Sequence, residues 1–428
     1  MTTGTLALII LGVILVQVAI VMLLIIHRRK REYQELDRSK DASPAVISTP
    51  SSLLSKQTAE TVASCSSWEG YREFSVQRKE FEDNNKSICS FYLVPLDSKP
   101  LPVFNPGQFL TFKLLLEDPV TYESKTIVRC YSLSDAPRSD YYRISIKRVP
   151  APASQPDVPP GLSSSFFHDH IKEGSKILVK AASGHFHLIE EEELLPIVLI
   201  GGGIGITPML SILNTVLERG VKTEVWLYYG IPSSDEHIMK AHLQVLARTH
   251  DNFHLHVCYS APNESDAEGI DYQHNTWVGI PLLRGTLKLM RYQFYVCGPK
   301  PMMESLLPGL EGLGVNSNDI YYESFGPATL IKHKKTAPAV SSEQPVNITF
   351  TQTAKTILWD PAADSLLEFA EANGIEVESS CRAGNCGSCQ TTVKAGEVDY
   401  NQEPDADLSP GHCLLCISKP KNDLTLEL

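Results

Sequence analysis

The sequence predicts a multidomain protein: one transmembrane helix, a β-barrel domain, an α/β domain built on a parallel sheet, and a compact C-terminal domain. Three observations support this prediction. An uninterrupted apolar segment opens the 428-residue chain, short alternating strands give way to alternating strands and helices, and three cysteines crowd into the stretch CRAGNCGSC. A chain of this length is expected to form two or three domains, each with its own core.

The composition is that of a globular protein, with 43% hydrophobic and 21% charged residues. A formal net charge of −12 argues against nucleic acid as a partner, because phosphate binding needs clustered Lys and Arg. The ten cysteines show no spacing typical of a disulfide framework, which indicates a reducing compartment.

Residues 6–26 form the apolar segment LALIILGVILVQVAIVMLLII, which has no charged residue and a single amide, Gln17. About 20 apolar residues in a helix span a bilayer core, so the segment predicts a transmembrane helix. The basic run HRRKR at 27–31 follows it, and such charge stays on the cytoplasmic side. A cleaved signal peptide would carry its basic residues before the apolar run. We therefore expect a single-pass protein of the inner or cytoplasmic membrane, with the remaining domains in the cytoplasm.

Residues 27–67 are polar and rich in Ser, Thr and Ala without a sustained period, which predicts a flexible tether. Short alternating runs then dominate residues 68–188, as in FLTFKLLL at 109–116 and YRISIKRV at 142–149, with turn residues between them. This pattern predicts an all-β domain, most simply a small barrel.

The pattern changes at Pro196, where an apolar strand runs into a glycine turn and an amphipathic helix, and further strands and helices alternate after it. Such alternation implies a parallel sheet, and we assign residues 189–330 to this α/β domain. The polar stretch at 331–344 is interpreted as a linker. Residues 345–428 are long enough for a small domain of their own.

The cysteine loop has the spacing Cys381-x4-Cys386-x2-Cys389, and Cys416 follows 27 residues later. This spacing is typical of a plant-type 2Fe–2S cluster, and the intervening glycines would let backbone N–H groups approach the sulfides. Cys413 forms a second CxxC pair with Cys416, so a zinc site remains an alternative. We interpret Cys413 as a small buried neighbour of the cluster.

Residues 345–428 resemble a plant-type ferredoxin domain in this cysteine loop, in the helical segment SLLEFAEANGI before it and in the segment LLCISKP after it. The resemblance implies an α+β domain with the β-grasp fold. It also implies that the ligands of the two irons are Cys381, Cys386, Cys389 and Cys416.

The middle of the chain carries further motifs: RCYSLS from Arg129, GGGIGITP from Gly201, CGP from Cys297 and ESFGP from Glu323. On these motifs residues 68–328 resemble the ferredoxin–NADP reductase superfamily, in which a flavin-binding barrel precedes a nicotinamide-binding domain. The order of flavin, nucleotide and ferredoxin domains resembles the phthalate dioxygenase reductase type.

On the flavin side, the resemblance implies that Arg129 binds the flavin phosphate, that Tyr131 packs on the isoalloxazine and ribityl, and that Ser132 hydrogen-bonds near N5. The turn GLSSSF at 161–166 would face the pyrophosphate with its N–H groups and Ser164. Members of this type that bind FMN carry an Arg in that turn. The chain has none, which favours FAD over FMN. The other expected flavin contacts are Ile146, Lys147, Gly161 and Ser163.

On the nicotinamide side, Gly203 and Gly205 would let the backbone approach the dinucleotide pyrophosphate. Thr207 is expected to cap the following helix, with Pro208 at its first position. The resemblance places Cys297 beside nicotinamide C4. It adds Gly298, Pro299 and Phe325 as cofactor contacts, and it makes Ser132, Cys297 and Glu323 the predicted catalytic residues.

The coenzyme preference depends on the segment IPSSDE at 231–236. A protein that binds the 2′-phosphate of NADPH needs an Arg or Lys side chain in this segment, and relatives often have an Arg where this chain has Pro232. Asp235 and Glu236 would instead repel an additional phosphate. The segment therefore favours NADH over NADPH.

Together these features imply a membrane-anchored reductase that passes electrons from NADH to FAD, then to the 2Fe–2S cluster and to an acceptor. Residues 343–428 contain fourteen acidic and five basic residues, which suggests a basic docking patch on the partner. The anchor favours a membrane oxygenase, hydroxylase or desaturase as that partner. The alternatives are an NADH:quinone-type reductase and a non-catalytic membrane redox sensor or assembly factor.

Overall fold

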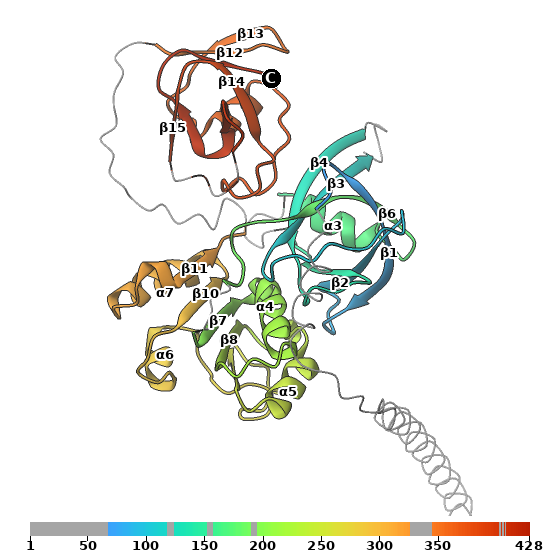
Figure 1. Ribbon diagram of the computed structural model, residues 1–428, viewed down its shortest axis with the longest axis vertical. Helices are drawn as coiled ribbons and strands as arrows, with labels where there is room; N and C mark the ends of the chain where they lie inside the picture. Colours follow the sequence, from blue (N-terminus) through green and yellow to red (C-terminus); the bar gives the residue numbers. More distant parts are fainter. Residues whose placement is uncertain are drawn as a thin grey trace, which may run out of the picture. The chain divides into compact units, whose positions relative to one another are not determined.

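The computed structural model (Figure 1) describes residues 67–117, 124–151, 157–189, 195–325, 345–401, 404, 406 and 408–428. These residues belong to one unit of the chain, 65–428. The transmembrane helix predicted at 6–26, nearly all of the tether at 27–67 and the linker at 331–344 lie outside the described residues. Within the described part, no helix combines the length and the apolar character needed to cross a membrane.

Antiparallel strands form the first domain, in the order β4-β3-β6-β1-β2-β5. A bridge between Leu133, which follows β4, and Ile144 of β5 joins the two edges, so the sheet closes into the expected barrel. Helix α3 (Leu162–Asp169) packs Phe167 against Phe91 and Phe112, with ring centroids 5.3 and 5.6 Å apart. The strands are β1 (Arg72–Phe81), β2 (Ile88–Pro95), β3 (Phe109–Glu117), β4 (Ser124–Ser132), β5 (Tyr142–Lys147) and β6 (Lys176–Ser183).

A parallel sheet forms the second domain, in the order β11-β10-β7-β8-β9. The strands are β7 (Ile197–Gly202), β8 (Val225–Ile231), β9 (Phe253–Tyr259), β10 (Gln293–Cys297) and β11 (Ile320–Glu323). The helices are α4 (Ile206–Glu218), α5 (Lys240–Thr249), α6 (Ile280–Thr286) and α7 (Lys300–Gly312). The strand order reverses between β7 and β10, and in open α/β sheets ligands bind at the carboxyl ends of the strands at such a point.

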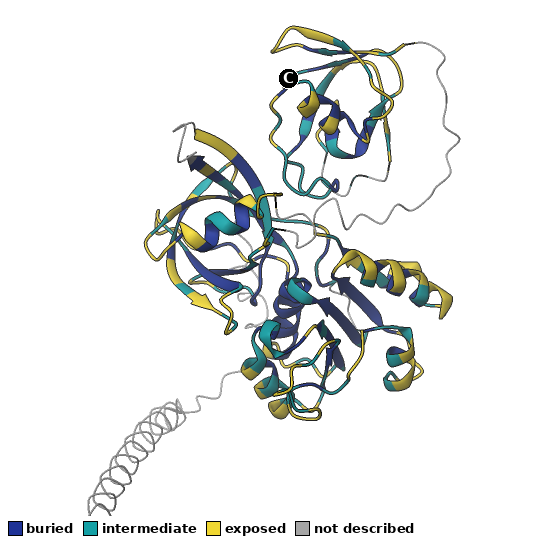
Figure 2. Cartoon of the chain, turned by 180° about the vertical axis from the view of Figure 1, so that it is seen from behind, coloured by how far each residue is buried: buried dark blue, intermediate teal, exposed yellow. Residues whose placement is uncertain are grey.

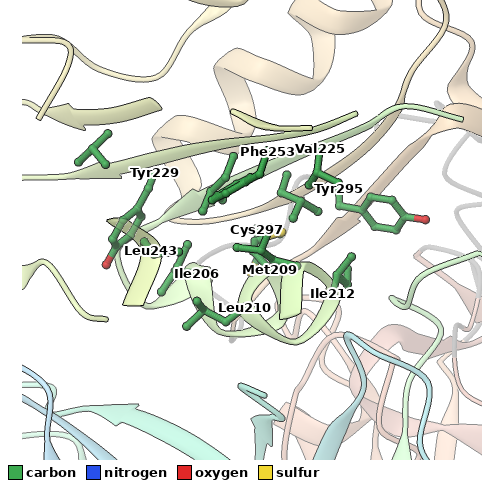
Figure 3. Packing of buried hydrophobic residues seen from close by; sticks show 14 of the residues in the cluster. Ile206, Met209, Leu210, Ile212, Val225, Tyr229, Leu243, Phe253, Tyr295 and Cys297 are labelled. Atoms are coloured by element: carbon green, nitrogen blue, oxygen red, sulfur yellow. The ribbon is translucent and has the colours of Figure 1, made fainter. Parts of the chain in front are cut away.

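The two faces of this sheet bury different helices. Helices α4 and α5 pack on one face through Met209, Leu210 and Leu243, and α6 and α7 pack on the other through Leu283 and Leu306. Figure 3 shows Ile206, Met209 and Leu210 of α4 beneath Cys297 and the strand residues of this core. Figure 2 shows the central strands of this sheet in dark blue, and residues 206–217 of α4 are all buried.

Helix α4 is buried on its outer side as well because the barrel covers it. Asp135, just after the barrel motif RCYSLS, accepts a hydrogen bond from Asn214 of α4 (2.8 Å), and Ser211 donates to its backbone carbonyl (2.8 Å). Burial acts to raise the pKa of Asp135, but the charge of Arg143, 3.7 Å away, and hydrogen bonds from Tyr141 and Asn214 lower it overall. The barrel and the nucleotide domain therefore share a polar, charged interface.

The C-terminal domain is a mixed sheet with one short helix, in agreement with the α+β prediction. Its strand order is β13-β12-β18-β14-β16, in which β12 and β18 run parallel, and β15 pairs with β17 apart from this sheet. Ser365 is the N-cap of helix α8 (Leu366–Ala372), and its hydroxyl accepts a hydrogen bond from the Glu368 N–H. The strands are β12 (Asn347–Phe350), β13 (Lys355–Leu358), β14 (Gln390–Ala395), β15 (Val398–Tyr400), β16 (His412–Leu414), β17 (Ser418–Pro420) and β18 (Leu424–Leu426).

Candidate functional site

The glycine turn lies at the switch point between β7 and β10. Gly201 pairs with Cys297 across the two strands, and a Cβ atom on Gly205 would lie 2.3 Å from the Cys297 carbonyl oxygen. A Cβ on Gly202 would lie 2.7 Å from Pro299 Cδ. Glycine is therefore required for the two strand ends to approach each other. Gly203 differs, because a Cβ atom on it would meet no other atom within 4 Å. Its φ of +54° lies in the left-handed region that glycine adopts most readily.

The helix after this turn starts earlier than the sequence predicts. The turn η1 (Gly203–Gly205) continues directly into α4, whose N-cap is Gly205 and whose first residue is Ile206. Thr207 therefore lies inside the helix, where its hydroxyl donates to the Ile204 carbonyl at 2.9 Å. The expectation that Thr207 caps the helix, with Pro208 at the first position, is wrong because the chain is already helical before Thr207.

The predicted catalytic residues come together from two domains. Ser132 Oγ, at the end of β4, lies 3.5 Å from Glu323 Oε2, although the two residues are 191 positions apart. Glu323 in turn pairs with Cys297 in adjacent parallel strands. Burial, with a smaller contribution from Glu323, raises the pKa of the Cys297 thiol well above its ordinary value. Cys297 is therefore a neutral thiol at physiological pH.

A cavity of about 400 Å³ opens beside this group. Its walls come from the nucleotide domain and from β5 of the barrel, and they include Lys147, Gly203, Gly298, Pro299, Trp277 and Phe325. The Lys147 ammonium lies 2.6 Å from a carboxylate oxygen of Glu236, so an ion pair joins the two domains at this cavity.

Trp277 was not among the residues predicted for the site. A single tryptophan in a loop carries no motif, and in a sequence it is most simply interpreted as a packing residue. In the structure its side chain is exposed and lines the cavity.

The predicted flavin-binding strand places Tyr131 on the wall of the barrel. Its ring meets Phe112 and Phe167 edge-on, and its hydroxyl lies 2.8 Å from Ser163 Oγ of α3. Burial raises the pKa of Tyr131 to about 12, so the phenol stays neutral. Arg129 is half-buried and donates to the Val128 carbonyl at 2.7 Å.

Ser164 forms hydrogen bonds within the structure at the start of α3. The Ser164 hydroxyl donates to the Gly161 carbonyl (3.0 Å) and accepts from the Val149 N–H (3.1 Å). It would have to rotate away from these partners to reach a phosphate. A Cβ on Gly161 would meet Val149 Cβ at 2.8 Å, so Gly161 allows the close approach. Ile146 lies in the barrel core, with its side chain buried.

Three of the predicted cluster ligands lie on one loop, and backbone N–H groups of this loop point at the cysteine sulfur atoms. The N–H groups of Ala383 and Asn385 point at Cys381 Sγ (3.3 and 3.4 Å), and the Cys381 N–H points at Cys386 Sγ (3.4 Å). Gly384 has a φ of +80°, and a Cβ there would collide with Ile417 at 2.6 Å. Thiolate sulfurs surrounded by N–H donors are the environment that an iron–sulfur cluster needs.

Two of the predicted cluster ligands, Cys386 and Cys389, lie next to other thiols. Hydrogen bonds from the Cys130 and Cys381 thiols lower the pKa of Cys386, and a hydrogen bond from Cys416 lowers the pKa of Cys389. Among the residues that the structure describes, no group of three or more His, Cys, Asp or Glu side chains converges as around a single metal ion.

Cys413 lies away from these thiols. It is buried, with 1% of its surface exposed, in the core between the sheet and α8, and its strand partner is Thr391. Burial raises the pKa of its thiol to about 12. This environment matches the interpretation of Cys413 as a buried neighbour.

The cluster loop also contacts strands of the barrel. Ser380 Oγ donates to Cys130 Sγ at 3.1 Å, and Lys113 Nζ lies 2.9 Å from Glu378 Oε1. Cys130 belongs to the predicted flavin-binding motif. The contacts therefore bring the two predicted redox sites close to each other.

Two segments match known domain families. Residues 199–307 match the family described as "Oxidoreductase NAD-binding domain". Residues 348–421 match the "2Fe-2S iron-sulfur cluster binding domain". These matches cover the glycine turn, Cys297 and the cysteine ligands.

Curated relatives are similar to part of the chain. The flavohemoprotein of Bacillus thuringiensis subsp. konkukian is 38% identical over 265 residues, which is 62% of this chain and 63% of that protein. The flavohemoprotein of Halalkalibacterium halodurans is 39% identical over 61% of each chain. The chain thus spans less than two thirds of the length of these relatives.

Solved structures show the same architecture. The FAD/NAD-binding domain of nitric oxide dioxygenase from Vibrio cholerae is 31% identical with a TM-score of 0.51, over 60% of this chain and 99% of that domain. Phthalate dioxygenase reductase is 24% identical with a TM-score of 0.51, over 84% of this chain and 98% of that protein. The second likeness is one of fold, and it extends over all three predicted domains.

Proposed function

We propose that this chain, which contains a domain of the oxidoreductase NAD-binding family and a domain of the 2Fe–2S cluster-binding family, transfers electrons from NADH through FAD to a 2Fe–2S cluster and on to an external acceptor. The observation that carries this proposal is the site at the switch point. There Glu323, the strand neighbour of Cys297, meets Ser132 of the other domain, and the glycine turn lines a cavity together with Lys147 of the barrel.

The NAD side of the proposal rests on the shape of the crevice. The ends of β7 and β10 pack backbone against backbone, which leaves room for a dinucleotide to lie along them. The Cys297 thiol is fully buried in the core, and Gly298 and Pro299, which follow it, line the cavity where a nicotinamide ring would lie.

The flavin side rests on the barrel and on the relatives. The Vibrio cholerae domain, named as an FAD/NAD-binding domain, matches this chain over the barrel as well as the nucleotide domain. Arg129, Tyr131 and Ser132 would hold the FAD phosphate, ring and N5 edge, and the hydrogen bond between Ser132 and Glu323 can hold a proton near that edge. When bound, FAD supplies the conversion from two-electron to one-electron chemistry, and the cluster supplies one-electron transfer.

The preference for NADH rests on the acidic segment after β8. Glu236 pairs with Lys147, and Asp235 accepts a hydrogen bond from Asn263 at 3.1 Å. Since the Lys147 charge is already paired, a 2′-phosphate would meet uncompensated negative charge. NADH carries no such phosphate.

The proposed electron acceptor is a membrane oxygenase or hydroxylase. The acidic C-terminal domain favours a partner with a basic docking patch. The apolar segment at 6–26 and the basic run after it favour a single-pass anchor in the cytoplasmic membrane, with the catalytic domains in the cytoplasm. A tether to the same membrane would raise the effective concentration of the partner.

The test is NADH oxidation by the full chain in detergent, loaded with FAD, iron and sulfide. Ferricyanide accepts electrons directly from flavins, whereas cytochrome c here reports the path through the cluster. The wild type should reduce both, and Cys386→Ser should keep ferricyanide reduction while losing most cytochrome c reduction. A loaded protein that oxidises no NADH would overturn the proposal in favour of a redox sensor. Rapid oxidation by a quinone, with none by cytochrome c, would favour the quinone-reductase alternative.

A further inference from the structure

Trp277 is an exposed aromatic side chain at the dinucleotide cavity. About 75% of its surface is accessible, and it lines the cavity together with Gly230, Ile231 and Pro232 at the carboxyl end of β8. An indole left in water forgoes the stabilisation that its burial would give, and ligand pockets are lined mainly by apolar and aromatic side chains.

The backbone around Trp277 is fixed from both sides. On its N-terminal side, the Tyr259 N–H donates to the His274 carbonyl (3.0 Å) and the His274 N–H donates to the Val257 carbonyl (3.1 Å), which ties the segment to β9. On its C-terminal side, Gly279 is the N-cap of α6. The loop therefore holds the indole in place at the cavity.

The neighbouring residue explains which way the indole faces. Val278 is 7% exposed and packs in the core beneath the sheet. A Cβ atom on Gly230 would lie 3.0 Å from Val278 Cγ2, so the glycine at the end of β8 makes this close packing possible. Because Val278 points inward, Trp277 beside it points outward to the cavity.

The strand order indicates which way round a dinucleotide would lie along the cavity. β7 lies between β10 and β8 in the sheet. The nicotinamide end of a dinucleotide belongs near Cys297 of β10, and its pyrophosphate belongs at the glycine turn after β7. The remaining end, which carries the adenine, then lies near the end of β8, where Trp277 is presented.

We propose that Trp277 is the stacking platform for the adenine ring of NADH. This inference rests on the proposed function, and it adds a binding residue that no motif in the chain indicates. A planar indole matches a planar purine, and stacking is indifferent to the charge and redox state of the nicotinamide. Trp277 would therefore contribute to affinity for the adenine half of the coenzyme and not to the hydride step.

The experiment measures binding of ADP-ribose, which contains the adenine half of NADH and lacks nicotinamide, to the full-length holoprotein by calorimetry. Trp277→Ala should weaken the binding of ADP-ribose about five- to hundredfold, which is the range expected for the loss of one base stack. Trp277→Phe should restore affinity to within about threefold. Leu289→Ala, at another exposed apolar residue that does not line the cavity, should bind like the wild type.

A second readout separates this role from a general loss of structure. Reduced nicotinamide mononucleotide lacks the adenine half, so Trp277→Ala should oxidise it with unchanged kcat/KM while kcat/KM for NADH falls. Equal ADP-ribose affinity of Trp277→Ala and wild type would overturn the platform and leave the proposed function intact. Failure of the wild type itself to bind ADP-ribose would also overturn the platform, whereas only failure of the loaded wild type to oxidise NADH would overturn the proposed function.

Discussion

Replacing Gly205 by alanine should disturb the predicted hydride-transfer site through the backbone alone. The new methyl group would lie 2.3 Å from the carbonyl oxygen and 2.6 Å from the carbonyl carbon of Cys297, and 3.0 Å from the Gly298 nitrogen. All of these atoms belong to the main chain at the end of β10, so no side chain can rotate away. Relief requires the Cys297–Gly298 segment to move by about 1 Å, since non-bonded carbon contacts settle near 3.5–4.0 Å.

The expected cost follows from opposing effects. Overpacking of this kind costs about 1–3 kcal/mol. Gly205 has an ordinary φ of −62°, so alanine gains back about 0.5–1 kcal/mol by restricting the unfolded chain. The free energy of unfolding should therefore fall by about 1–2 kcal/mol, which lowers the Tm of the transition by about 2–8 °C for a domain of 150–250 residues.

The assay compares Gly205→Ala with Gly285→Ala in the full-length protein. Gly285 lies in α6 of the same domain, and a Cβ there would meet no atom within 4 Å, so its alanine variant should be neutral or slightly stabilising. Tm is measured by differential scanning calorimetry, and the rate of flavin reduction by NADH is measured by stopped flow. We expect Gly205→Ala to slow flavin reduction at least tenfold, because a misplacement near 1 Å can cost far more. Wild-type Tm and wild-type reduction rate in Gly205→Ala would refute the packing argument.

Further predictions concern the cluster, the domain interface and the coenzyme. Cys413→Ala should retain the visible absorbance of a reconstituted 2Fe–2S cluster, whereas Cys416→Ala should lose it; the opposite result would make Cys413 a ligand. Asp135→Asn should lower the free energy of unfolding by about 3 kcal/mol, because it leaves the buried Arg143 without a counter-ion, and urea titration measures this loss. The pKa of Asp135 is lowered in the folded state, so its stabilisation is complete above the ordinary carboxyl range near pH 4 and is lost as the pH falls below it. Urea midpoints at pH 3 and 7 should therefore differ less in Asp135→Asn than in the wild type. Glu236→Gln should raise kcat/KM for NADPH about tenfold relative to NADH, since it removes one negative charge and frees its lysine partner; an unchanged ratio would place the 2′-phosphate elsewhere.

The parts of the site that the sequence predicted are those encoded by short, local motifs. Cys381, Cys386 and Cys389 lie on one tight loop, and within it the Cys381 N–H points at Cys386 Sγ. The glycines at 201–205 indicate a strand that turns directly into a helix, and the structure has this turn. The start of the helix was predicted two residues late, because a Thr-Pro pair typical of a helix start lies after a turn that is already helical.

The contacts between distant segments could not be obtained in this way. Glu236 was predicted to disfavour a phosphate, but its partner Lys147 lies on a strand of another domain. Trp277 has no motif, and its outward direction depends on Val278 packing against Gly230 from a different part of the chain. Asp135 pairs with Asn214 of α4 only because the barrel covers that helix.

By itself, the sequence determined the strand–turn–helix at the glycine turn and the three thiols that share a loop, because each depends on residues that are close together in the chain. Only the tertiary structure decided that Ser132, Glu323 and Cys297 meet, that Lys147 faces Glu236 and that Trp277 opens onto the cavity. The physical reason is that these contacts are set by how whole elements pack. Strand order and domain packing bring together residues as distant in sequence as Ser132 and Glu323, 191 positions apart, and no local pattern records which of them will touch.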